Sequence, residues 1–296
     1  MNVLINIRGT LMINPKNVME KLFTPGNLPK LYNNRLHYID LHIIDSCNFN
    51  CARCFKFSPL CKTAGIVNKK QTIKDIKQLA LLEPGLDGIS IIGGEPLISP
   101  DLIDYMYVIH KELPNTDITI ITNGLAIPKM PEEFFKALID NNVMLAISKY
   151  FEDNFYNDIL NILAQHGCED RYVFSKVEGL GCAMFLQMNL DESGSQNIKT
   201  IWDKCSAKNG CVMLKDSKLW SCSNHCMKYI LNNYFGTNLK DYQEDGIDIY
   251  KNSYKKIIEH LKKPKKGCRY CTEKIYEAMY FPEHTTYNKS EWIKNN

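Results

Sequence analysis

Three closely spaced cysteines are the strongest constraint in this sequence. Cys47, Cys51 and Cys54 form a C-x3-C-x2-C arrangement that follows an apolar run. Three thiolates at this spacing can bind three irons of a cubane [4Fe–4S] cluster and leave the fourth iron open to a non-protein ligand. An electron carrier or a structural zinc site would have four protein ligands. Cys61 is badly placed to be the fourth, so we expect a reactive cluster.

A glycine pair follows the next apolar strand and adds a second constraint. Glycine lets the backbone approach a ligand closely, and here the pair follows Ile89-Ser90-Ile91-Ile92. Together the two motifs make the chain similar to the radical S-adenosylmethionine (SAM) superfamily. The resemblance implies that Cys47, Cys51 and Cys54 bind the cluster and that SAM chelates the open iron. It also implies that the SAM amino group is received by Gly93, Gly94, Glu95 and Pro96.

Composition limits the domain size, the partners and the cellular compartment that we expect for this chain. The chain has 296 residues, of which 45% are hydrophobic and 23% charged, which suits one large domain with a small appendage. A net charge of +3 does not favour nucleic-acid binding. Apolar runs are too short for a membrane span, so we expect a cytoplasmic protein. In that compartment twelve cysteines indicate metal ligation rather than disulfides.

Strand and helix patterns alternate along the first part of the chain. The predicted strands are 36–44, 88–92, 117–122 and 143–148, and the predicted helices are 72–82 with Thr72 as cap, 131–141, 155–166 and one starting at Ser99-Pro100-Asp101. Repeated βα units predict an α/β fold with a parallel sheet and outer helices. The resemblance narrows this to a partial (β/α)6 barrel, with the motifs at the carboxyl ends of strands.

Two further residues end predicted strands. Thr122-Asn123-Gly124 is similar to the TNG turn of the superfamily, and Ser148 matches a position where many members carry a serine near SAM. The resemblance implies that Asn123 and Ser148 contact the cofactor. The alternative is that Asn-Gly forms an ordinary turn and that the serine bonds the backbone.

A second set of cysteines occupies the later part of the chain. Segments 212–215 and 218–221 flank Asp216-Ser217 and predict a β-hairpin. This region resembles the twitch domain, the short form of the SPASM auxiliary-cluster domain. The resemblance implies one auxiliary [4Fe–4S] cluster bound by Cys205, Cys222, Cys268 and Cys271. Zinc is the alternative metal, and the competing ligands are Cys211 and Cys226.

These units divide the chain into an N-terminal extension (1–35), a barrel (36–195), a twitch-like domain (196–275) and a tail (276–296). The resemblance implies that SAM is cleaved reductively to a 5′-deoxyadenosyl radical that abstracts hydrogen from a small hydroxylated substrate, a sugar or aminocyclitol. It also implies a flavodoxin or ferredoxin as reductant. We expect net oxidation, which would make the protein an oxidoreductase. The alternatives are a maturase or epimerase acting on a ribosomally made peptide, or a metal-stabilised binding protein.

The sequence constrains the catalytic residues least, namely those that would accept the substrate proton or return a hydrogen atom to the substrate. Candidate proton acceptors are Lys149, Tyr150 and Arg171. In an epimerase, a thiol such as Cys182 or Cys211 would instead return a hydrogen atom. Otherwise, small buried hydrophobic roles are expected for all five remaining cysteines: Cys61, Cys168, Cys182, Cys211 and Cys226.

Overall fold

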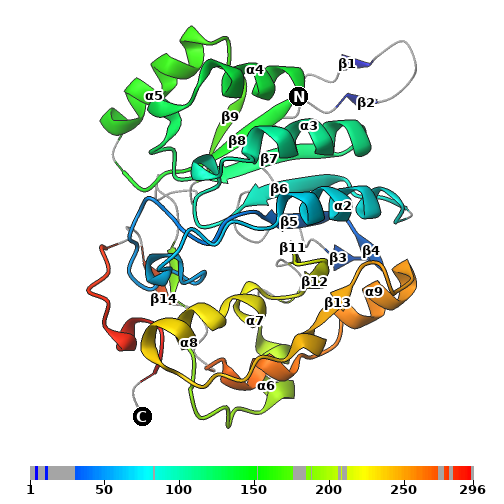
Figure 1. Ribbon diagram of the computed structural model, residues 1–296, viewed down its shortest axis with the longest axis vertical. Coiled ribbons are helices and arrows are strands. Elements are labelled where there is room, and N and C mark those ends of the chain that lie inside the picture. Colours follow the sequence, from blue (N-terminus) through cyan, green and yellow to red (C-terminus); the bar gives the residue numbers. More distant parts are fainter. Residues whose placement is uncertain are drawn as a thin grey trace.

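The computed structural model describes residues 4–5, 11–12, 31–82, 84–151, 153–175, 185–187, 189–205, 208, 212–272, 277–279 and 283–294. An eight-stranded sheet forms its centre, in the order β13-β12-β11-β5-β6-β7-β8-β9 (Figure 1). The strands are β5 (Tyr38–His42), β6 (Gly88–Ile92), β7 (Asp117–Thr122), β8 (Val143–Ser148), β9 (Tyr172–Ser175), β11 (Met213–Lys215), β12 (Lys218–Trp220) and β13 (Gly246–Asp248).

Strands β5 to β9 run parallel, each paired with the next along the chain. Their carboxyl ends therefore meet at one edge of the sheet. The predicted strands 88–92, 117–122 and 143–148 are confirmed to the residue. The first predicted strand was too long, because Arg35–Leu36 (β4) turns away to pair with Leu31–Tyr32 (β3).

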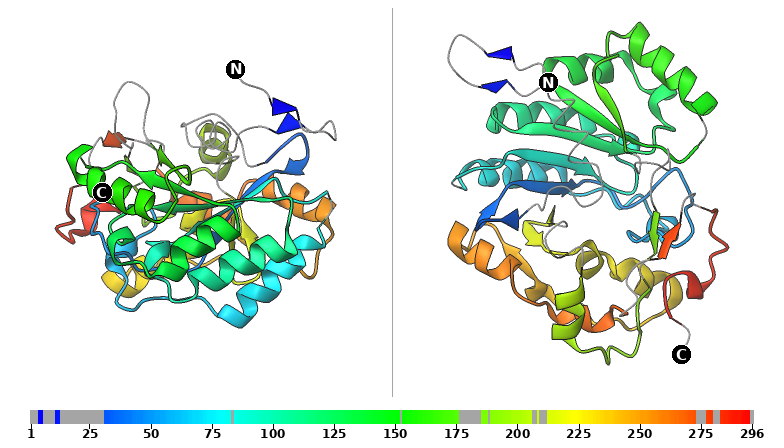
Figure 2. Two further views of the ribbon diagram at one scale, coloured as in Figure 1. Left: turned by 90° about the horizontal axis from the view of Figure 1, so that it is seen from above. Right: turned by 180° about the vertical axis from the view of Figure 1, so that it is seen from behind.

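Four helices cover one face of the parallel sheet (Figures 1 and 2). They are α2 (Lys69–Ala80), α3 (Leu102–Glu112), α4 (Glu132–Asp140) and α5 (Asp153–Gln165). The prediction that Thr72 caps its helix was wrong, because Asn68 accepts the Gln71 N–H at 3.0 Å one turn earlier. α3 also begins later than expected, with Asp101 at the cap position and no side-chain cap bond.

The main core lies between these helices and the sheet. β6 is buried along its whole length, as expected of a parallel strand covered on both faces. Ile76 of α2, Tyr105 of α3 and Phe134 of α4 are fully buried in this core. Each such side chain contributes about 1.5–3 kcal/mol through burial.

The predicted hairpin is confirmed as β11 and β12, and it extends the barrel sheet. β11 pairs in parallel with β5, so the sheet continues across the predicted domain boundary at 195/196. At the turn Asp216 and Ser217 both have positive φ, 51° and 61°, as a two-residue hairpin turn requires. Buried Asp75 of α2 accepts the Ser217 N–H at 3.1 Å and its hydroxyl at 2.9 Å, which offsets the missing glycine.

Short elements complete the fold. They are β1 (Leu4–Ile5), β2 (Leu11–Met12), β10 (Phe185–Gln187), β14 (Glu277–Met279), α6 (Ile198–Lys204), α7 (Ser223–Met227), α8 (Tyr229–Phe235), α9 (Tyr254–Leu261), and the 3-10 helices η1 (Ser58–Leu60), η2 (Pro96–Ile98), η3 (Ile127–Lys129), η5 (Gln243–Asp245), η6 (Lys266–Tyr270) and η7 (Lys289–Glu291). Within the described ranges, no helix is long and apolar enough to cross a membrane.

Candidate functional site

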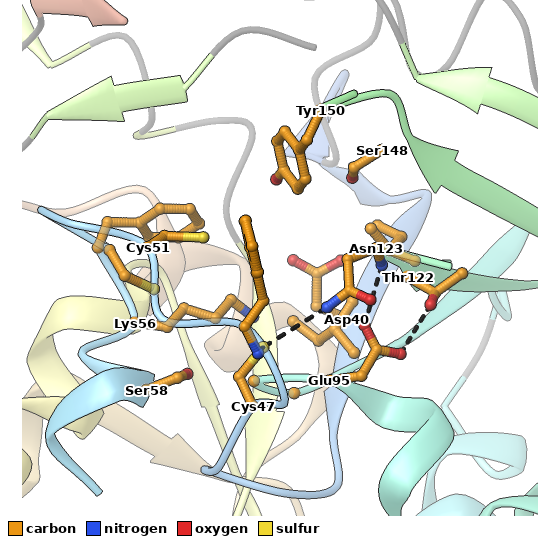
Figure 3. A pocket seen from close by; sticks show the side chains of 17 residues that line it. Asp40, Cys47, Cys51, Lys56, Ser58, Glu95, Thr122, Asn123, Ser148 and Tyr150 are labelled. Carbon is orange, nitrogen blue, oxygen red and sulfur yellow. Dashed lines mark hydrogen bonds between the residues drawn. The ribbon is translucent and has the colours of Figure 1, made fainter. Parts of the chain in front are cut away.

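A cavity of about 210 Å³ lies at the carboxyl ends of the parallel strands (Figure 3). The cysteines of the first motif line it together with residues from the ends of β6, β7 and β8. Its lining residues are Asp40, Cys47, Phe49, Cys51, Cys54, Phe55, Lys56, Ser58, Ile92, Gly93, Gly94, Glu95, Ile121, Thr122, Asn123, Ser148 and Tyr150. Of the predicted cofactor residues, Pro96 lies outside this lining, at the start of η2. The other residues of the first site meet in one place.

The surroundings of Cys47 and Cys51 disfavour ionisation of these two thiols. Burial, the Glu95 carboxyl and the Cys54 thiol raise the pKa of Cys47 to about 12. Burial and the neighbouring thiols of Cys54 and Cys47 raise the pKa of Cys51 further still. Iron would supply the missing positive charge, because thiolate is its ligand in such clusters. No three His, Cys, Asp or Glu side chains in the described ranges surround a single metal-ion position, and these three thiols instead border a cavity.

The glycine pair joins β6 to the beginning of the cysteine loop. Gly94 N–H donates to the Ile44 carbonyl at 2.7 Å, and Glu95 N–H donates to the Ser46 carbonyl at 3.0 Å. A Cβ atom at Gly94 would lie 2.1 Å from that Ser46 oxygen, and one at Gly93 would lie 2.5 Å from the Ile44 oxygen. Both glycines therefore permit a close approach between two backbones. This structural role accounts for the pair without reference to any ligand.

Glu95 connects the ends of two strands through its side chain. It is 1% exposed, and one carboxyl oxygen accepts the Leu97 N–H at 3.0 Å and the Thr122 hydroxyl at 2.7 Å. The other oxygen accepts the Asn123 N–H at 2.9 Å. Burial raises the Glu95 pKa to about 7, although these three bonds oppose the shift. Protein donors already occupy the carboxyl group that the motif suggested for the cofactor.

Asn123 connects β7 to the cysteine loop. Its side-chain amide donates to the Asn48 side-chain oxygen at 2.8 Å and lies 3.7 Å from the Cys47 sulfur. Its own side-chain oxygen accepts the Leu125 N–H at 2.9 Å. Asn123 therefore forms the expected turn and also lines the cavity.

Aromatic rings border the cavity above the cysteines. Phe49 stacks on Tyr150 with ring centroids 6.4 Å apart and meets the Phe151 ring edge-on at 5.4 Å. Burial raises the Tyr150 pKa well above its ordinary value, and a hydrogen bond with Ser148 opposes the shift. Tyr150 is therefore a neutral hydrogen-bonding group and a poor proton acceptor.

Sequence reasoning missed three polar residues of the cavity: Asp40, Lys56 and Ser58 (Figure 3). Asp40 had a detectable signal, because polar and apolar residues alternate along β5 although it is a central strand. Lys56 and Ser58 follow the last cysteine of the loop at alternate positions. Only the path of that loop brings them to the cavity.

Two of the predicted proton acceptors lie away from the cavity. Lys149 pairs with Asp153, and its ammonium lies 5.8 Å from the Phe174 ring centroid. Arg171 immediately precedes β9, at the amino edge of the sheet, where its guanidinium bonds the Asn142 side chain. Arg171 therefore lies outside the cavity lining, toward the opposite edge of the sheet. Cys182 and Cys211 lie outside the described residues.

Sequence comparison agrees with this geometry. Residues 41–171 match the profile of the Radical SAM superfamily. The chain contains a radical SAM domain. This domain begins in β5 and extends to the residue before β9, so it includes the cysteine loop, Gly93, Gly94 and Asn123. Membership of this domain in the superfamily implies a [4Fe–4S] cluster and SAM as its cofactors.

Individual relatives align with this chain over only part of their own sequences. A GTP 3',8-cyclase of Alkaliphilus oremlandii is 30% identical over 118 residues, which are 36% of this chain and 33% of that protein. A GTP 3',8-cyclase of Peptoclostridium acidaminophilum is 30% identical over 104 residues, 34% of this chain and 31% of that protein. The chain thus matches about a third of the length of these curated relatives. A crystal structure of BtrN in complex with AdoMet and 2-DOIA aligns with 83% of this chain and 99% of its own, at 16% identity and a TM-score of 0.48.

The second cysteine set lies beyond the radical SAM domain. Cys205 ends α6, and α6 packs against η6, which contains Cys268. Burial raises the Cys271 pKa to about 12, and the charges of Cys268 and Cys205 add to the shift. These three thiols therefore lie within electrostatic range of each other. Cys222 is at the cap position of α7, at the end of the hairpin.

The remaining described cysteines have other surroundings. Cys61 borders a separate cavity of about 160 Å³ with Asp45 and Tyr229, so it is not part of the first site. Cys226 packs against the hydrophobic cluster that includes Phe57, and its sulfur donates to the Ser223 carbonyl. Cys168 is fully buried, as expected of a structural cysteine.

The C-terminal segment 283–294 lies against the cysteine loop of the radical SAM domain (Figures 1 and 2). Ala52 N–H donates to the Glu283 carbonyl at 2.6 Å, and Thr285 N–H donates to the Asn50 carbonyl at 2.9 Å. The fully buried Trp292 donates its indole N–H to the Cys54 carbonyl at 2.9 Å. We call this segment the strap.

The strap also reaches the second cysteine set. Leu190 N–H donates to the Trp292 carbonyl at 2.8 Å, and Leu190 forms an isolated antiparallel bridge with Cys271. Lys289 of the strap pairs with Glu192 at 2.6 Å. One short run of backbone therefore connects the two cysteine-bearing regions.

Proposed function

We propose that this radical SAM enzyme is an oxidoreductase that removes hydrogen from a carbon bearing a hydroxyl or amino group in a small substrate. The observation that supports it best is the convergence of Cys47, Cys51 and Cys54 with the strand-end residues on one cavity. We propose that these thiols hold the [4Fe–4S] cluster. The backbone around Gly93, with Asn123 and Ser148, would hold SAM.

When bound, the cluster and SAM supply a 5′-deoxyadenosyl radical. The residues of the chain orient the reactants and exclude water. Lys56 can pair with a carboxylate, and Ser58 and Ser148 offer hydroxyls. Phe49 and Phe55 give the cavity apolar walls that suit an adenine ring. The donor set thus fits a zwitterionic nucleoside beside a hydroxylated molecule.

Oxidation of H–C–OH to C=O requires three transfers. The hydrogen atom leaves with 5′-deoxyadenosine, the hydroxyl proton goes to a base, and one electron goes to an acceptor. We propose Asp40, a carboxylate on the cavity wall, as the base. We propose an auxiliary cluster at Cys205, Cys222, Cys268 and Cys271 as the electron acceptor.

The second candidate function is modification of a ribosomally made peptide. The small volume and the polar groups of the cavity favour a small hydroxylated substrate over a peptide chain. The name GTP 3',8-cyclase belongs to proteins that this chain matches over about a third of their length. The partial match supports the shared radical chemistry more than the cyclisation.

The first experiment tests SAM cleavage. After anaerobic reconstitution, dithionite and SAM should release 5′-deoxyadenosine, and Cys51→Ala should abolish that release. Intact release in Cys51→Ala would refute the cluster assignment. Cys168→Ala is the matched control, because that thiol is buried away from the cavity.

The second experiment identifies the outcome by mass spectrometry with deuterated sugars and aminocyclitols. Oxidation transfers deuterium to 5′-deoxyadenosine and leaves the product two hydrogens lighter. A product of unchanged mass that gains one deuterium from heavy water would instead establish epimerisation.

A further inference from the structure

Lys228, between α7 and α8, carries a buried amino group. Its side chain is 3% exposed, and its Nζ atom has no hydrogen-bond partner among the described residues. The aromatic rings of Tyr242 and Tyr270 face it at 5.4 Å and 5.8 Å. Ring faces attract a cation but do not replace hydrogen bonds. A buried ammonium without such bonds destabilises the fold unless an anion comes close to it.

Lys228 lies within electrostatic range of two cysteines of the second set. Burial lowers its pKa, and the nearby anionic groups of Asp241, Asp245 and Cys222 oppose the shift. Lys228 in turn opposes the rise in the pKa of Cys271. The geometry agrees, because the amino group faces the ring of Tyr270, which lies in η6 between Cys268 and Cys271.

Two other buried side chains around this set are hydrogen-bond donors or cations. Lys265 is 2% exposed, donates to the His260 carbonyl, and lies near the Cys268 thiol. The His225 ring is buried, with Nε2 4.0 Å from the Cys268 sulfur. The nearby carboxylate of Asp245 already accepts the Lys266 and Gly267 N–H groups, at 2.8 Å and 2.7 Å. The surroundings as a whole favour a negatively charged occupant.

We propose that the second cysteine set binds an anionic metal–thiolate centre and that the Lys228 ammonium donates hydrogen bonds to its sulfur atoms. The proposal rests on the auxiliary cluster of the proposed function and adds a residue that controls its charge balance. Four thiolates give such a centre a net negative charge, and reduction adds another. A fixed cation therefore stabilises the reduced form more than the oxidised form and raises the reduction potential. A raised potential suits an electron acceptor.

The first test compares stability with and without metal, using Lys228→Met. Without metal the variant should unfold at a higher temperature than wild type, because an unsatisfied buried group has been removed. After anaerobic loading with ferrous iron and sulfide, its gain in stability should be smaller than that of wild type. Lys240→Met is the matched control: this exposed lysine faces the same Tyr242 ring at 5.3 Å and should leave both values unchanged. An equal shift of apo and loaded protein would refute the role of Lys228.

The second test measures the midpoint potential of the second centre, in a background where Cys47, Cys51 and Cys54 are alanine. Lys228→Met should shift the midpoint potential to more negative values. Lys228→Arg and Lys240→Met should leave the midpoint potential close to that of the protein with Lys228. Bound iron with an unchanged potential would refute the role of Lys228 and leave the proposed function intact.

Zinc binding separates the two proposals further. If zinc alone is retained and iron is not, the electron-acceptor role fails, while the stability comparison with zinc loading still decides the role of Lys228. If neither metal binds, both proposals fail.

Discussion

Replacing Trp292 with phenylalanine tests whether the strap positions the cysteine loop. The indole N–H donates to the Cys54 carbonyl at 2.9 Å from a fully buried ring. Losing that bond costs about 0.5–1.5 kcal/mol, and the smaller ring leaves a partial cavity that costs about 1 kcal/mol more. The Phe57 N–H still donates to the same carbonyl, so the oxygen keeps one partner. We therefore expect the contact between the strap and the cysteine loop to lose about 2 kcal/mol of stability. This corresponds to roughly a thirtyfold change in the equilibrium for local separation of the strap from the loop.

Amide hydrogen exchange of the apo protein measures that opening directly. The Ala52 and Thr285 amides, whose bonds join the loop to the strap, should exchange roughly thirtyfold faster in Trp292→Phe. The same variant should lose iron from the first site faster than wild type after reconstitution.

Trp220→Phe is the matched control for this prediction. Trp220 is 3% exposed and donates its indole N–H to the Lys215 carbonyl at 3.2 Å, within the β11–β12 hairpin. It should lower global stability by a similar amount and leave the exchange of the Ala52 amide unchanged. If both variants accelerate that exchange equally, the strap has no specific hold on the loop and our reasoning is refuted.

Three further predictions concern the cavity. Gly94→Ala places a Cβ 2.1 Å from the Ser46 carbonyl oxygen, so iron analysis should show loss from the first site alone; retention there would contradict the close-contact argument. The folded Glu95 pKa of about 7 exceeds its ordinary value of 4.5, so the folded state holds a proton that the unfolded chain releases between these values. The free energy of unfolding of the apo wild type should therefore fall by on the order of 3 kcal/mol relative to Glu95→Gln as the pH rises from about 4.5 to 7. If the unfolding free energies of the two proteins instead change in parallel over this pH range, Glu95 is already ionised in the folded state. Asp40→Asn should slow substrate oxidation by about 10²-fold or more while 5′-deoxyadenosine is still released; unchanged product formation would remove Asp40 as the base.

Local sequence patterns predicted most of the parallel strands and most of the residues that line the first cavity. The strands at 88–92, 117–122 and 143–148 are short, mostly apolar segments rich in isoleucine and other apolar residues, a pattern typical of buried parallel strands. The three cysteines belong to one loop, so their convergence needed no long-range information. The helix starts were less certain, because Asn68 and Thr72 could each cap α2 and only the observed bond separates them.

Contacts between residues far apart in the chain came only from the tertiary structure. Trp292 meets Cys54 across a separation of 238 residues, and no local pattern marks such a pair. Glu95 belongs to a recognisable motif, yet its partners Thr122 and Asn123 come from the next strand. The charge around Lys228 likewise depends on packing among α7, α8 and η6. A sequence shows which side chains can ligate or carry charge, but their surroundings depend on which distant segments the fold brings beside them.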